Sequence, residues 1–135
     1  LLALGSMVGP SLEAAERLRR EGVSVGVVDA CLARPLDAET ILAQARGHSV
    51  VVTVEEHVLS GGFGAAVTTM LHEAGLGQAR VLRLGLPDEF VSHGPRDVLL
   101  RESGLDAAGI ARACVTMLQP GAATDPDIAG MRYRK

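Results

Sequence analysis

Apolar stretches with strong β propensity alternate with amphipathic stretches along most of the chain, and this alternation limits the fold to few choices. The strongest β segment is SVVVTVEE at 49–56, and similar segments lie at 1–6, 23–30 and 79–87. Segments with the apolar spacing of a helix lie at 11–22, 35–47, 63–75, 95–104 and 105–118. The order β-α-β-α-β-α-β-α-α predicts an α/β fold, in which a mostly parallel sheet of four clear strands, with room for a fifth, lies between helices.

Capping residues mark the ends of several of these helices. Ser11, Asp37 and Asp106 are expected to cap the first, second and last helix, because short polar side chains accept hydrogen bonds from the free N–H groups of a first turn. Gly22 and Gly75 are expected to end the first and third helix, since glycine adopts the left-handed conformation that follows many helices.

Composition narrows the class of protein. The 135 residues suit a single domain, expected at 1–118, followed by an irregular tail at 119–135. Aromatic residues make up only 2 %, so the core must be aliphatic, as is common where parallel strands are buried on both faces. The net charge of −3 and the scarcity of aromatics argue against nucleic-acid binding, and no run of 18 apolar residues predicts a membrane span.

The two cysteines and the first residues bear on the cellular setting. Cys31 and Cys114 are far apart and form no CxxC pattern, so we expect a reducing, cytoplasmic setting and two small buried side chains. The first eight residues are too short for a signal peptide and have no basic leader. They also have no initiator methionine, so the sequence is expected to be part of a longer chain.

The stretch TVEEHVLSGGFGAAV at 53–67 is the best candidate for a functional loop. Glu55 and Glu56 are expected at the carboxyl end of the central strand, where ligands usually bind in α/β sheets. Gly61, Gly62 and Gly64 lie at the start of the next helix. The free N–H groups of a helix start favour the binding of an anion. The spacing matches neither the dinucleotide motif nor the P-loop. Two interpretations stay open. The glycines form either a turn that packs closely on a strand or a partner subunit, or a loop that contacts a ligand.

Other polar residues do not assemble into a recognisable active site. Glu55, Glu56 and His57 are consecutive and cannot converge on one metal ion from a strand, and no G-x-S-x-G elbow is present. His93, in a loop, is the best candidate for contacting a substrate, with a structural or interface role as the alternative. Asp29 is expected to cap or stabilise a turn. The sequence therefore predicts that this segment contains no catalytic, cofactor-binding or metal-binding residue.

Four stretches together resemble a known enzyme family. They are VVDACLARPLD at 27–37, VVTVEEHVLSGGFGAAV at 51–67, LRLGLPDEFVSHG at 82–94 and ESGLDAAGIARA at 102–113. Their content and order resemble the C-terminal domain of the 1-deoxy-D-xylulose-5-phosphate synthases, which are transketolase-like and depend on thiamine diphosphate. The resemblance covers about residues 1–118. It departs from the family at Cys31 and Leu32, where Arg and Phe are usual, at Arg34 in place of Lys, and at His57 in place of Asn or Gly.

The resemblance implies a fold and a function. The fold would be a three-layer α/β/α domain with a five-stranded sheet, mostly parallel with one antiparallel edge strand. The whole enzyme would condense pyruvate with D-glyceraldehyde 3-phosphate and release CO₂, in isoprenoid precursor synthesis. Thiamine diphosphate and Mg²⁺ would be held by larger N-terminal domains. This domain would stabilise the protomer and the homodimer. The glycine turn would lie at a domain or subunit boundary, and Gly62 would have a positive φ.

Two alternatives remain. The segment could be the equivalent domain of a transketolase or of a 2-oxo acid dehydrogenase β subunit, which share the TVEE and GGFG segment. It could also be a regulatory module that holds a small anion at the helix start near Gly61 to Gly64.

Overall fold

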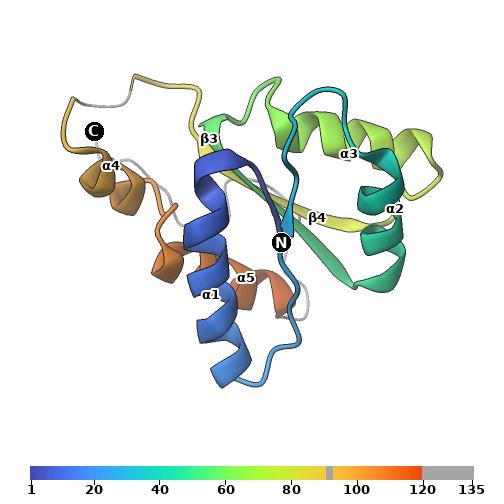
Figure 1. Ribbon diagram of the computed structural model, residues 1–135, viewed down its shortest axis with the longest axis horizontal. Helices are drawn as coiled ribbons and strands as arrows, with labels where there is room; N and C mark the ends of the chain where they lie inside the picture. Colours follow the sequence, from blue (N-terminus) through green and yellow to red (C-terminus); the bar gives the residue numbers. More distant parts are fainter. Residues whose placement is uncertain (91–92, 120–135) are drawn as a thin grey trace.

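Four parallel strands form the sheet of this protein (Figure 1). The structure is a computed structural model that describes residues 1–90 and 93–119. The strands are β1 (Leu2–Ala3), β2 (Val28–Asp29), β3 (Val50–Val58) and β4 (Arg80–Leu86), in the spatial order β2-β1-β3-β4. The predicted α/β class with a parallel sheet is confirmed. The antiparallel edge strand that the resemblance implies is not among the strands of the described residues.

Helices cover both faces of the sheet. After the 3₁₀ turn η1 (Gly5–Met7), the helices are α1 (Val8–Arg20), α2 (Ala38–Gly47), α3 (Phe63–Glu73), α4 (Arg96–Glu102) and α5 (Ala107–Leu118). Figure 1 shows α1 and α5 on one side of the sheet and α2 and α3 on the other. Three layers therefore form, as the sequence predicts. In the described residues no helix is long and apolar enough to cross a bilayer.

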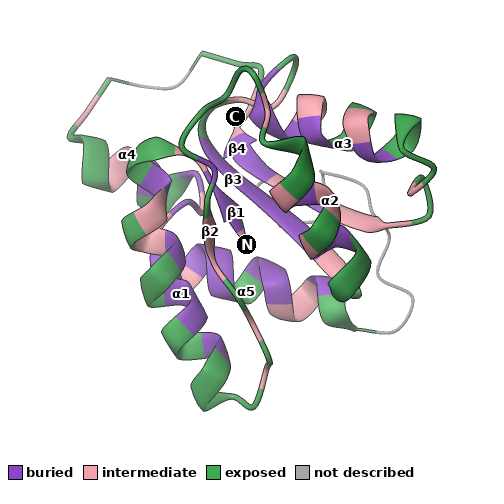
Figure 2. Ribbon diagram, turned by 45° about the vertical axis from the view of Figure 1, so that its right-hand side comes forward, coloured by how far each residue is buried: buried purple, intermediate pink, exposed green. Residues whose placement is uncertain are grey.

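The central strand β3 is buried on both faces, as Figure 2 shows. Val52 and Val54 belong to the core cluster under α1 and α5, whereas Val51 belongs to the cluster under α2 and α3. This division follows from the alternation of side chains along a strand. It explains why the strand reads as a continuous apolar run and why the strongest β signal lies at the centre of the sheet.

Two of the three predicted helix caps are confirmed. Asp37 accepts a hydrogen bond from the Thr40 N–H at 3.1 Å, and Asp106 accepts one from the Gly109 N–H at 2.8 Å. The prediction for Ser11 is wrong, because α1 begins three residues earlier, at Val8. Pro10 is tolerated in that first turn, where its missing N–H has no intrahelical partner.

The helix-ending glycines behave as predicted. Gly22 and Gly75 follow α1 and α3 with φ of +81° and +76°. The predicted strand at 23–30 is paired only at Val28–Asp29, where it runs beside β1 at the edge of the sheet. The domain boundary at 118 stays a prediction, and residues 120–135 of the predicted tail lie outside the described residues.

We predict that Asp106→Ala lowers the free energy of unfolding by about 1 kcal/mol, because the Gly109 N–H at the start of α5 loses its acceptor. Chemical denaturation of the variant and the parent protein measures this difference. Arg112→Ala, at an exposed position of the same helix, is the control and is expected to change stability by less than about 0.5 kcal/mol. An Asp106→Ala variant as stable as the control would contradict the capping role.

Candidate functional site

The candidate residues gather at the carboxyl edge of the sheet. The chain passes from β1 to β2 on one side and from β3 to β4 on the other, so the strand order reverses between β1 and β3. In open α/β sheets, ligands bind in the crevice at such a reversal, outside the carboxyl ends of the strands. Here that crevice is a surface hollow lined by Leu4, Arg34, His57 and the segment 61–63, among others.

Glu55 turns inward from the end of β3 and has no exposed surface. Its Oε2 accepts a hydrogen bond from the Phe63 N–H at 2.6 Å, and its Oε1 accepts one from the Gly64 N–H at 2.7 Å. These are N–H groups of the first turn of α3, which have no partner within the helix. Glu55 is therefore the N-terminal cap of α3, supplied by the preceding strand and not by the residue before the helix.

Glu55 faces α3 because side chains alternate along β3, so that it shares a face with Val51 and Thr53. The pairing of β3 with β4 is irregular at this point. Val54 pairs with Leu84 and Val58 pairs with Leu86, so that three residues of β3 face one residue, Gly85, of β4. Such a bulge re-aims side chains and strengthens the local twist of the strand. A Cβ at Gly85 would lie 2.8 Å from the His57 carbonyl oxygen and 3.1 Å from the Glu55 Cγ. Glycine is needed at this strand position for close approach, a role that the sequence analysis missed.

Glycine is required at positions 61, 62 and 64 of the turn for different reasons. Gly61 has a φ of +69°, which favours glycine. Gly62 has a φ of −75°, so the prediction of a positive φ at Gly62 is wrong. Its Cβ would instead lie 2.3 Å from the Glu55 Oε2, and a Cβ at Gly64 would lie 2.4 Å from the Thr53 Oγ1. Both glycines are required because the Glu55 carboxylate and the strand lie against them.

Glu56, the next residue, points to the surface and joins three segments. Its carboxylate accepts hydrogen bonds from Arg96 at 2.8 and 2.5 Å, and from the Ser6 hydroxyl at 2.5 Å. Ser6 belongs to η1, and Arg96 is the first residue of α4. The hydrogen bond from Arg96 is the main cause that lowers the pKa of Glu56 below its ordinary value. This ion pair ties the loop after β4 to the end of the central strand.

The two histidines of the candidate set lie apart. His93 is exposed and lines a second hollow, together with Glu56, Leu86, Arg96 and Leu99. His57 is also exposed, and its Nδ1 lies 3.0 Å from the Val58 carbonyl oxygen. Within residues 1–90 and 93–119, no group of three or more His, Cys, Asp or Glu side chains converges as a metal site requires.

The prediction of two buried cysteines is half right. Cys114 is buried on α5, and this burial raises the pKa of its thiol to about 11. Cys31 is exposed, contrary to the prediction, and has a φ of +55°. Asp29 accepts a hydrogen bond from the Cys31 N–H at 2.9 Å, which confirms the turn role of Asp29, and its negative charge raises the pKa of the Cys31 thiol. Neither thiol is activated as a nucleophile.

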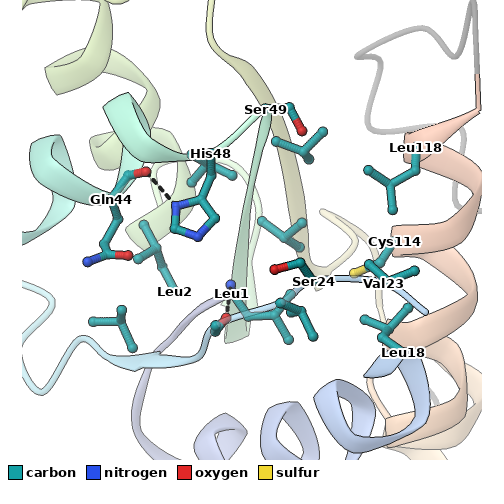
Figure 3. Close-up of a pocket in the computed structure, with 16 residues that line it drawn as sticks. Leu1, Leu2, Leu18, Val23, Ser24, Gln44, His48, Ser49, Cys114 and Leu118 are labelled. Atoms are coloured by element: carbon teal, nitrogen blue, oxygen red, sulfur yellow. Dashed lines mark hydrogen bonds between the residues drawn. The ribbon is translucent and has the colours of Figure 1, made fainter. Parts of the chain in front are cut away.

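A separate apolar cavity lies at the opposite edge of the sheet, where the strands begin (Figure 3). Its volume is about 90 Å³, and Leu18, Val23, Val50 and Cys114 are among the residues that line it. The His48 Nδ1 points away to the Gln44 carbonyl oxygen at 2.8 Å. The cavity wall is mainly aliphatic, with Ser24, Gln44 and Ser49 among its polar residues.

Comparisons with known proteins agree with the sequence resemblance. The family model "Transketolase, C-terminal domain" matches residues 1–110. The chain is 43 % identical to 1-deoxy-D-xylulose-5-phosphate synthase 1 of Geobacter sulfurreducens, over 96 % of the chain and 20 % of the relative. It is 52 % identical to 1-deoxy-D-xylulose-5-phosphate synthase of Synechococcus sp. (strain JA-2-3B'a(2-13)), over 82 % of the chain and 17 % of the relative. The chain thus spans about a fifth of the length of these curated relatives.

A solved structure has the same fold. It is described as "Split gene transketolase, inactive beta4 tetramer", and it matches with a TM-score of 0.79 and 37 % sequence identity. The match covers 87 % of this chain and 38 % of that one.

We predict that Gly62→Ala lowers the free energy of unfolding by about 1–3 kcal/mol, because the new methyl group would overlap the Glu55 carboxylate and the Val58 carbonyl oxygen. Thermal and chemical denaturation measure the change. Gly9→Ala is the matched control, since a Cβ there meets nothing within 4 Å and lies in α1, where alanine is favoured. Equal stability of the two variants would contradict the close approach at Gly62.

The Glu56–Arg96 pair predicts a dependence on pH. The pKa of Glu56 is lowered in the folded protein, so the pair contributes stability above the ordinary glutamate pKa of 4.5, and this contribution disappears as the pH falls through the lowered value. Glu56→Gln is therefore expected to be less stable than the parent at pH 7, and this difference shrinks at pH values below 4.5. Denaturation midpoints from pH 7 down to acid measure it. A difference that stays constant with pH would contradict the contribution of the ion pair.

Proposed function

Because the chain belongs to the transketolase C-terminal domain family, we propose that it is the C-terminal domain of a 1-deoxy-D-xylulose-5-phosphate synthase and acts there as a structural and dimerisation domain. The whole enzyme condenses pyruvate with D-glyceraldehyde 3-phosphate and releases CO₂. The domain comprises residues 1–118, with 119–135 as a tail, in a cytoplasmic homodimeric enzyme. The observation that carries the proposal is the 43–52 % identity to synthases over most of this chain.

The chemistry of the carboxyl edge supports a structural role. Glu55 is bonded to the start of α3, and Glu56 is bonded to Arg96 and Ser6. Acid–base catalysis requires a titratable group that reaches a substrate, and both carboxylates are held by groups of this chain. We propose that no residue of the segment is catalytic and that the segment alone is inactive.

Thiamine diphosphate and Mg²⁺ belong, in this proposal, to other domains of the enzyme. Mg²⁺ prefers an octahedral set of oxygen ligands, typically one or two carboxylates together with phosphate oxygens and waters. The acidic side chains at the carboxyl edge do not converge in this way, since Glu55 points inward and Glu56 outward. The described residues therefore do not fit the Mg²⁺ of this cofactor.

Exposed residues of the same edge provide a surface for the rest of the enzyme. Leu32 is 56 % exposed after β2, and Phe90 is fully exposed after β4. Aromatic side chains such as Phe are enriched where one protein surface contacts another. We propose that both exposed apolar side chains contact the N-terminal domains of the same enzyme, with Glu56, Gly61 and His93 at the border of that contact.

The activity is tested on the full-length protein. We predict formation of 1-deoxy-D-xylulose 5-phosphate and CO₂ from pyruvate and D-glyceraldehyde 3-phosphate, and this activity requires thiamine diphosphate and Mg²⁺. Mass spectrometry of the product measures it. The transketolase reaction, with ketose donors, and the acyl-transfer reaction of 2-oxo acid dehydrogenases are assayed in parallel. Activity in one of those assays, and none with pyruvate and the triose phosphate, would favour the alternative families.

The interface is tested with Phe90→Ser in the full-length protein. Removing a buried aromatic anchor from an interface costs about 2 kcal/mol or more, so we expect weaker docking of the domain, seen as faster proteolysis at its boundary or a lower dimer fraction. Leu12→Ser is the control, because Leu12 is also an exposed apolar residue, at 52 %, but lies on helix α1 and not on a loop that follows a strand. Identical behaviour of the two variants would remove Phe90 from the interface.

A further inference from the structure

The start of α3 has the features of an anion site in a doubly wound fold. It follows the central strand β3 and lies beside the reversal of strand order between β1 and β3. Backbone N–H groups at such a helix start bind phosphate or carboxylate groups of external ligands, since the helix dipole favours negative charge there. In this protein the Phe63 and Gly64 N–H groups already have an acceptor, the Glu55 carboxylate.

The surroundings of this carboxylate are shaped to hold it. Positions 62, 64 and 85 are glycines, and a Cβ at any of them would come within 3.1 Å of an atom of the Glu55 side chain. The hydroxyl of Thr53, also fully buried, lies next to Gly64 and has no hydrogen-bond partner among the described residues. The site therefore has two N–H donors, a further buried polar group and a space free of β-carbons, all around one planar carboxylate.

We propose that Glu55 is a built-in occupant of this anion site, which keeps external anions out, and that removing its terminal atoms opens the site to a free carboxylate. This occupancy of one helix start does not depend on which reaction the whole enzyme performs. It also explains how a fold with a ligand-binding edge serves as a structural module. The anion that completes the edge is part of the chain.

The substitution Glu55→Ala gives an atom-for-atom test. It removes Cγ, Cδ and the two carboxylate oxygens, which are the heavy atoms of acetate. Added acetate can thus restore both hydrogen bonds to α3. Glu55→Gln keeps the volume but turns one acceptor oxygen into an NH₂ donor that faces an N–H, and it leaves no room for acetate. Glu56→Ala removes the same atoms from the neighbouring residue and is the matched control.

Hydrogen exchange of the full-length protein, measured by mass spectrometry on a peptide covering residues 61–66, reports on these amides directly. In Glu55→Ala, the Phe63 and Gly64 amides are expected to exchange about tenfold faster than in the parent protein, because a charge-assisted hydrogen bond is lost at each. Acetate slows this exchange in a saturable way, whereas chloride at the same ionic strength does not. The parent protein and Glu56→Ala respond to neither acetate nor inorganic phosphate.

Two results would overturn the proposal. One is equal exchange of Glu55→Ala in acetate and chloride, and the other is protection of these amides in the parent protein by acetate or phosphate. If Glu55→Ala does not fold, Glu55→Gln decides. Faster exchange that acetate does not change supports the proposal, and exchange equal to that of the parent overturns it. A hydrogen-exchange result that contradicts the anion-site proposal would not affect the assay of the synthase reaction, so each proposal has its own test.

Discussion

The contact between Glu55 and the first turn of α3 determines how the carboxyl edge of this domain is built. A carboxylate with no exposed surface is costly to bury unless its oxygens are hydrogen-bonded. Two backbone N–H groups and the dipole of α3 meet that requirement. The same hydrogen bonds fix the start of α3 against the end of the central strand β3. The glycines at 62, 64 and 85 follow from this contact, since side chains there would occupy the same space.

The same contact connects the core to the surface. The alternation of side chains along β3 that turns Glu55 inward leaves Glu56 pointing outward, where Arg96 and Ser6 bind it. Adjacent acids in the sequence thus hold α3 on one side and α4 on the other. Both carboxylates of this edge are hydrogen-bonded by groups of the chain, and the exposed apolar side chains Leu32 and Phe90 lie on the loops around them. An edge of this kind suits docking to other domains better than chemistry on a substrate.

Membership of the transketolase C-terminal domain family and the structure support one picture. The chain matches about a fifth of the length of the synthases that it resembles, and in its described residues no group of three or more His, Cys, Asp or Glu side chains gathers as a metal site requires. In the structural role that we propose, the domain contributes to the enzyme by packing, so its sensitive positions are those where backbone and side chain approach closely. Gly62 and Glu55 are such positions.

The sequence by itself determined the features that depend on neighbours along the chain. The period of the apolar residues predicted the α/β class and the parallel sheet, and Asp37 and Asp106 were identified as caps because a capping residue lies within three residues of the N–H that it binds. The tertiary structure decided what depends on distant residues. The cap of α3 comes from Glu55, eight residues before Phe63, whose side chain lies against Gly85 of another strand. No local pattern records that contact, because it exists only when β3, β4 and α3 are packed together.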